Sequence, residues 1–179
     1  MRQTVSKSLL HKFMSELSRR TTGSGKIYFA GGATALLLGF RQQTVDIDIK
    51  IDPEPKGIFE AIAAIKNELD LNIELAAPSD FIPASPLWRD LASHITDVGD
   101  LSFFHYDLAL QALAKIERGF SHDLADASNL VAKGYVSVEQ LMGRFDEIEP
   151  YLIRYPAINP KQFKSKLDNF LSSFSLESK

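Results

Sequence analysis

The sequence predicts a mixed α/β (α+β) protein, in which a sheet flanked by helices is followed by a C-terminal helical part. Two observations lead to this expectation. Before residue 105, several short stretches alternate apolar and polar residues, as half-buried strands do. After residue 106, apolar residues recur at helical spacing and glycines separate the segments. We therefore expect a first domain over residues 1–105 and a helical subdomain over residues 106–179.

The N-terminal third should contain two helices and two strands. Residues 5–20 place apolar side chains at helical spacing, with basic residues between them. A short apolar strand follows at residues 27–30, and Gly31-Gly32 separates it from a compact helix over residues 33–40. The clearest strand lies at residues 45–51, where valine and isoleucine alternate with charged residues.

Further along, a helix over residues 57–69 leads to a second alternating strand at residues 71–75. Three prolines within nine residues mark a long loop, and residues 93–105 have the pattern of a hairpin. Helices are expected over residues 106–118 and 122–133. Two more helices follow, one opened by a capping box of Ser137 and Gln140 and the last by Asn159-Pro160.

Composition narrows the class of protein. The chain has 179 residues, of which 45% are hydrophobic and 24% are charged, as in ordinary globular proteins. It has no cysteine, so disulfides and thiolate metal sites are excluded. Its net charge of −3 does not call for a broad nucleic-acid-binding face. No apolar run approaches the roughly 18–20 residues that cross a bilayer. We expect a cytoplasmic protein with no membrane partner.

Two aspartates on the clearest strand are the first candidate site residues. Side chains two apart on a strand share a face, so Asp46 and Asp48 should point the same way, about 7 Å apart. Like charges repel, and aspartate is a poor strand former. Mg²⁺ would remove the repulsion, because it prefers oxygen ligands and often sits between carboxylates and phosphates. Two such ions can serve one phosphoryl transfer. A simple amphipathic strand with a solvated face is the alternative.

The glycine pair strengthens the first interpretation. Gly31 and Gly32 lie between a strand and a helix, where a backbone without Cβ atoms can approach a ligand closely. The first amides of a helix are also suited to phosphate. The order is therefore strand, glycine pair, short helix, and then the strand with both aspartates.

This order resembles the signature of the DNA-polymerase-beta-like nucleotidyltransferase superfamily. The matching stretch reads FAGGATALLLGFRQQTVDIDIKI, and thirteen residues separate Gly32 from Asp46. The resemblance covers residues 27–51 directly. It implies a mixed sheet, two Mg²⁺ ions held by Asp46 and Asp48, and a nucleoside triphosphate such as ATP near Gly31 and Gly32. The implied reaction moves a nucleotidyl group to a hydroxyl.

Members of this superfamily usually carry a third acid on a neighbouring strand. Glu74 is the best candidate, because it lies on the polar side of the strand at residues 71–75. It would serve as a metal ligand or as a general base. Asp52 and Asp80 are weaker alternatives, and a solvent-facing role for Glu74 stays open.

The segment ALAKIERGFSHDLADASNL, residues 112–130, is similar to small bacterial nucleotidyltransferases of the abortive-infection and type IV toxin–antitoxin kind. The similarity implies that Lys115 meets the triphosphate, helped by Arg118, and that Asp123 orients Lys115 or the nucleotide. It also makes tRNA, another RNA end or a protein plausible as the acceptor, and a cognate antitoxin plausible as a partner. Without the upstream motif, these charges would be assigned to a solvated helix face and a helix start.

Arg41 and Thr44 flank the turn before the aspartate strand, where they either contact phosphate or brace the turn. The leading hypothesis is thus a Mg²⁺-dependent nucleotidyltransferase. A catalytically inactive module of the same fold, binding a nucleotide or a partner, is the second hypothesis. A structural or regulatory protein with a solvated aspartate strand is the third.

Overall fold

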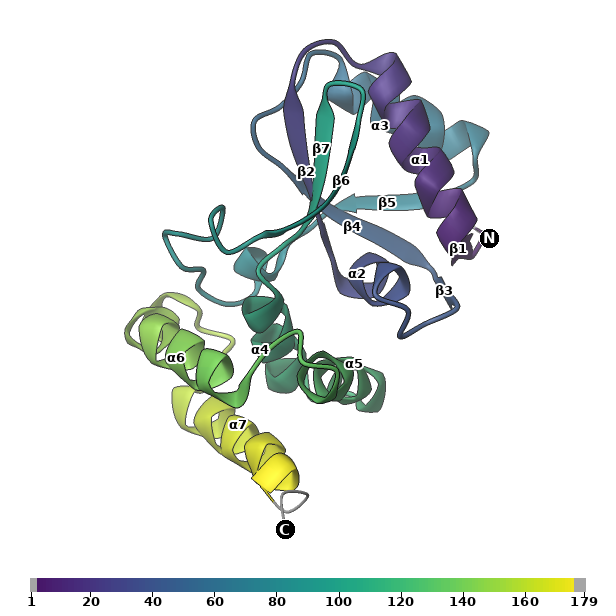
Figure 1. The fold of residues 1–179 in the computed structure, drawn as a ribbon. Helices are drawn as coiled ribbons and strands as arrows, with labels where there is room; N and C mark the ends of the chain where they lie inside the picture. Colours follow the sequence, from purple (N-terminus) through teal and green to yellow (C-terminus); the bar gives the residue numbers. More distant parts are fainter. Residues whose placement is uncertain (1–2, 176–179) are drawn as a thin grey trace. The chain divides into compact units, whose positions relative to one another are not determined.

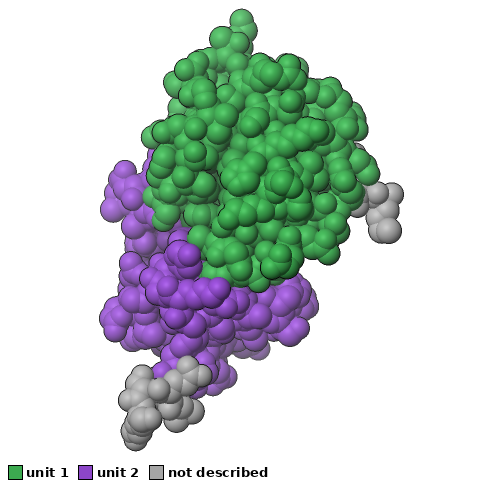
Figure 2. Space-filling view, turned by 45° about the vertical axis from the view of Figure 1, so that its right-hand side comes forward, with its two compact units in different colours: residues 1–77, 92–106 green, residues 78–91, 107–179 purple. Residues whose placement is uncertain are grey.

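The computed structural model describes residues 3–175 and confirms the mixed α/β fold (Figure 1). Its contacts divide the chain into two compact units (Figure 2). The first comprises residues 1–77 and 92–106, and the second comprises residues 78–91 and 107–179. The proline-rich segment 78–91 thus groups with the helical unit, although the sequence places it within the first domain.

A five-stranded mixed sheet forms the frame of the first unit. Its strand order is β5-β4-β2-β7-β6, with β2 and β4 antiparallel and β2 and β7 parallel. Strands β4 and β5 are parallel, and β6 and β7 form the predicted hairpin. The strands are β2 (Gly25–Ala30), β4 (Asp46–Ile51), β5 (Asn72–Leu75), β6 (Ser93–Val98) and β7 (Leu101–His105). β4, which carries both aspartates, is therefore flanked by a strand on each side.

A second, smaller sheet pairs β1 (Val5–Ser6) with β3 (Gln43–Thr44) in antiparallel register. This pairing explains why helix α1 (Lys7–Arg20) begins two residues later than predicted. The hydroxyl of Ser6 accepts a hydrogen bond from the amide of Leu9, which caps the helix. The N-terminal segment is thereby tied to the turn that leads into β4.

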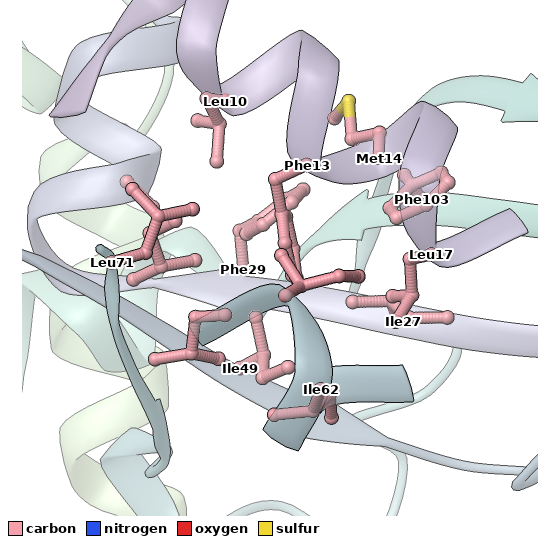
Figure 3. Close-up of a cluster of buried hydrophobic side chains, with 14 of the residues drawn as sticks. Leu10, Phe13, Met14, Leu17, Ile27, Phe29, Ile49, Ile62, Leu71 and Phe103 are labelled. Carbon is pink, nitrogen blue, oxygen red and sulfur yellow. The ribbon is translucent and has the colours of Figure 1, made fainter. Parts of the chain in front are cut away.

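One face of the large sheet carries the core of the first unit. Side chains of α1 pack with those of the central strands and of α3 (Ile58–Glu68), as Figure 3 shows. The rings of Phe29 and Phe103 stack with their centroids 5.9 Å apart, and Phe13 meets Phe29 edge to face at 6.3 Å. Ile47 and Ile49 of β4 belong to this core and are fully buried. The intervening aspartates therefore face away from it.

The second unit consists mainly of helices. They are α4 (Leu108–Arg118), α5 (Ser121–Ala132), α6 (Val138–Ile148), the 3₁₀ helix η2 (Glu149–Arg154) and α7 (Pro160–Ser175), together with the short 3₁₀ helix η1 (Pro78–Asp80). The predicted capping box opens α6, where Ser137 and Gln140 each bond the other's backbone amide. Across residues 3–175, the helices fall short of the length and apolar character needed to cross a membrane.

A buried histidine ties helix α2 (Gly31–Leu37) to the end of β7. Nδ1 of His105 lies 3.2 Å from the hydroxyl of Thr34, and this hydroxyl donates to the carbonyl of Phe29. Because the one hydroxyl proton is used by Phe29, the ring nitrogen must donate, which defines the neutral tautomer of His105. Burial lowers the pKa of His105 to about 4, from an ordinary value of 6.5.

This buried imidazole should make the stability of the protein depend on pH. In the unfolded chain His105 gains a proton near pH 6.5, whereas the folded protein resists protonation down to about pH 4. Lowering the pH through this window therefore favours unfolding, while above pH 6.5 both states are neutral. Between pH 7 and pH 4.5 we expect His105 to cost the wild type roughly 2–3 kcal/mol of unfolding free energy.

Urea denaturation of wild type and His105→Gln at the two pH values measures this difference. The variant should lose packing and the Thr34 hydrogen bond at pH 7, but its stability should fall less on acidification. Parallel pH profiles for the two proteins would contradict the assignment of a depressed pKa to His105.

Candidate active site around the aspartate strand

The face of β4 turned away from the core presents Asp46 and Asp48. The alternation is clear in the burial of β4: Ile47 and Ile49 are inaccessible, whereas both aspartates are partly exposed. A shift of one residue in the pairing would bury both carboxylates, so the core holds the acids on this face. Asp46 and Asp48 therefore share one face of the folded strand.

Strand β5 adds two polar side chains beside the aspartates. In the parallel register, Asn72 is the partner of Asp46 and Glu74 is the partner of Asp48. Because paired residues on neighbouring strands point to the same side of a sheet, these four side chains share one face. The structure therefore places Glu74, the first choice for the third acid, next to the aspartate pair.

The two weaker candidates for the third acid lie elsewhere. Asp52 follows the end of β4, about 13 Å further along the strand direction than Asp48, and its amide bonds to the carbonyl of Lys26. Asp80 belongs to η1 in the second unit. Of the three candidates, Glu74 alone is in register with the aspartate pair.

The amide of Asn72 bridges two of the carboxylates. Its Nδ2 lies 2.6 Å from Oδ1 of Asp46 and 2.9 Å from Oε1 of Glu74. Asn72 lies on the same side of its strand as Glu74, but it was not among the candidate site residues named from the sequence. Asn72 and Glu74 are two residues apart on one strand, and this spacing is the sequence signal that could have pointed to Asn72. Only the register of β5 against β4 shows which acids it contacts.

The glycine pair begins helix α2 instead of preceding it. The helix starts at Gly31, immediately after Ala30, which is the register partner of Asp48. Gly31 has a φ of +56°, and a Cβ atom there would stand 2.4 Å from Oδ2 of Asp48. The glycine thus lets the backbone come against the Asp48 carboxylate. The close approach to a ligand stays a prediction.

Gly32 makes a second close approach, to the turn before β4. A Cβ atom at Gly32 would lie 2.0 Å from Oγ1 of Thr44 and 3.7 Å from a guanidinium nitrogen of Arg41. Thr44 is 7% exposed, and its hydroxyl donates to the carbonyl of Asp46 over 3.3 Å. Of the two roles left open for Thr44, these contacts support bracing the turn. Arg41 is partly exposed beside the glycine pair.

Lys115, Arg118 and Asp123 form a separate cluster within the second unit. Lys115 is 7% exposed, and its ammonium lies 2.7 Å from Oδ2 of Asp126 and 3.3 Å from Oδ1 of Asp123. Nε of Arg118 is 3.1 Å from Oδ2 of Asp123. Two buried carboxylates thus neutralise two cations across the junction of α4 and α5.

Asp126 is the member of this cluster that the sequence analysis missed. It lies three residues after Asp123 on the same face of α5, and this helical spacing is the signal that points to it. Asp123 contacts Lys115, and its orienting role stays a prediction. A contact between Lys115 and a triphosphate remains a prediction.

The donor set available for a cation is made of oxygens. Within residues 3–175, no three or more histidine, aspartate or glutamate side chains come together in a ready-made metal cage. Mg²⁺ does not require such a cage, because it keeps several waters and takes one or two carboxylates together with substrate phosphates. Asp46 and Asp48 place two carboxylates on one face of β4.

The chain matches no family model, and the comparisons with curated proteins and with solved structures found no match.

The close packing at Gly32 can be tested by adding a single methyl group. Gly32→Ala would force its Cβ against Thr44, and overpacking of this kind costs about 1–3 kcal/mol of unfolding free energy. Gly143 in α6 is the matched control, because a Cβ there meets nothing within 4 Å. Gly143→Ala should raise stability by about 0.5–1 kcal/mol through helix propensity.

Chemical denaturation of the two variants compares these effects directly. Opposite signs for the two substitutions are expected. Equal stabilisation by both would show that the glycine pair is not packed against the turn at Thr44.

Proposed function

We propose that this protein is a Mg²⁺-dependent nucleotidyltransferase that moves a nucleotidyl group from a nucleoside triphosphate to a hydroxyl acceptor. The observation that carries the proposal is the approach of the Gly31 backbone to the carboxylate of Asp48, on the face of β4 that also bears Asp46. A backbone that must be glycine, placed against one of two aspartates that share a strand face, suits a phosphate group and a hard cation together.

The residues fit a divalent cation by their chemistry. Asp46 and Asp48 are oxygen donors on one face, and Glu74 stands in register with Asp48. When bound, Mg²⁺ would neutralise charge on the triphosphate and stabilise the oxygens that enter and leave the reacting phosphorus. Asp46 and Asp48 would hold the ion, and Glu74 would serve as a further ligand or accept the proton of the attacking hydroxyl.

The glycine pair and its neighbours would bind the nucleotide. Gly31 and Gly32 would let the phosphate chain lie against the backbone, and Thr44 would keep the turn in place through the carbonyl of Asp46. Arg41, partly exposed beside Gly32, supplies a guanidinium suited to phosphate oxygens. A contact of Lys115 and Arg118 with the triphosphate stays a prediction that rests on the sequence resemblance.

The acceptor is proposed to be an RNA end, such as that of tRNA, or a protein. A single acceptor end needs only a local basic patch, which a net charge of −3 permits. A cognate antitoxin would be the partner if the protein belongs to a toxin–antitoxin pair. The proposed compartment is the cytoplasm.

One observation favours a second candidate, a catalytically inactive module that binds a nucleotide or a partner. The ammonium of Lys115 is already engaged by Asp123 and Asp126. Such a module would bind nucleotide without turning it over, so a transfer assay separates it from the enzyme.

The test mixes purified protein with Mg²⁺, total RNA, cell extract and each α-labelled nucleoside triphosphate in turn. Wild type should move label into RNA or protein. The double variant Asp46→Asn/Asp48→Asn keeps the size of both side chains and should lose at least about 100-fold in rate, because charge stabilisation at the phosphorus is lost. EDTA should abolish transfer by the wild type.

Asp146→Asn is the control, since Asp146 is exposed on α6. It should transfer label at the wild-type rate. If wild type and the double variant were equally inactive but bound nucleotide equally well, the active-site assignment would be wrong. If wild type bound nucleotide, the double variant did not, and neither transferred label, the protein would be the inactive module.

A further inference from the structure

We propose that Asn72 is a positioning residue of the candidate metal site, in which its side-chain amide holds Asp46 and Glu74 in place for the cation. The inference rests on the proposed function, because it assigns a role within the same site. Asn72 is not among the candidate site residues named in the sequence analysis. The supporting observations are its register, its two hydrogen bonds and the charges that surround it.

The position of Asn72 is defined by backbone pairing. It is the register partner of Asp46 in the parallel pair of β4 and β5, and Glu74 follows two residues later on the same face. One nitrogen, Nδ2, lies within hydrogen-bonding distance of Asp46 Oδ1 at 2.6 Å and of Glu74 Oε1 at 2.9 Å. A primary amide has two protons, so each carboxylate can receive one.

The charges on this face explain why a donor is needed here. Asp46, Asp48 and Glu74 place three carboxylates on adjacent strands, and like charges on neighbouring strands destabilise a sheet. A neutral amide with two donors satisfies two of these carboxylates without adding a positive charge that would compete with a cation. Asparagine is disfavoured in strands, so its presence at this register is consistent with a role for the side chain.

The two hydrogen bonds also restrict how the carboxylates turn. Because Oδ1 of Asp46 and Oε1 of Glu74 both accept from the Asn72 amide, neither carboxylate can rotate without losing a hydrogen bond. Partners of this kind, which contact ligands and not the metal, set the orientation of the ligands. Removing one of them typically weakens metal affinity by about 10–100-fold.

The test is a titration of the intact protein with Mn²⁺ alone, followed by the loss of the free Mn²⁺ signal in electron paramagnetic resonance. Wild type, Asn72→Ala, Asn72→Ser and Asp46→Asn are compared. Asn67→Ala is the matched control, because Asn67 is an exposed asparagine on α3 in the same unit. Melting temperatures without metal establish that each variant is folded.

We expect Asn72→Ala to raise the dissociation constant for Mn²⁺ by about 10–100-fold, with Asn67→Ala unchanged. Asn72→Ser, which keeps one donor, should fall between Asn72→Ala and wild type, and it serves as the readout if Asn72→Ala does not fold. Asp46→Asn should bind least.

The failures of the two proposals are distinguishable. If wild type binds Mn²⁺, Asp46→Asn does not, and both Asn72 variants bind like wild type, the role of Asn72 is overturned while the metal site stands. If wild type and Asp46→Asn show the same absence of binding, the metal site itself is overturned and the role of Asn72 with it.

Discussion

The central constraint in this structure is that two aspartates face the same way on a strand whose other face is the core. Ile47 and Ile49 are fully buried, so β4 cannot slip by one residue without driving carboxylates among Phe13, Phe29 and their neighbours. Asp46 and Asp48 are therefore held on one face of β4. The Gly31 backbone lies against Asp48, and the amide of Asn72 donates to Asp46.

The sequence was sufficient for features that arise from local periodicity. The alternation at residues 45–51 predicted both β4 and the shared face of its aspartates, and the capping box predicted the start of α6. Contacts that depend on pairing between distant segments could not be predicted from the sequence. The later start of α1 follows from the pairing of Val5 with Thr44, and helix α2 begins at the glycine pair itself.

The same distinction applies to the candidate site. Glu74 could be named from alternation alone, whereas the bridge made by Asn72 depends on the parallel register of β5 against β4. In the second unit, the order of Lys115 and Asp123 was visible in the sequence. The burial of Lys115 between Asp123 and Asp126 could not be predicted from the sequence, because it depends on the packing of α4 against α5. Removing one partner of such a buried ion pair lowers the free energy of unfolding. The cluster therefore also stabilises the packing of α4 against α5.

The most direct measurement is a crystal structure of the protein grown with Mn²⁺ and a non-hydrolysable nucleoside triphosphate, with anomalous diffraction used to locate the metal. We predict an anomalous peak bound by carboxylate oxygens of Asp46 and Asp48, with the phosphates against the backbone of Gly31 and Gly32. A triphosphate and its metal bound elsewhere, with the aspartate face carrying only water, would contradict the assignment of this face as the active site.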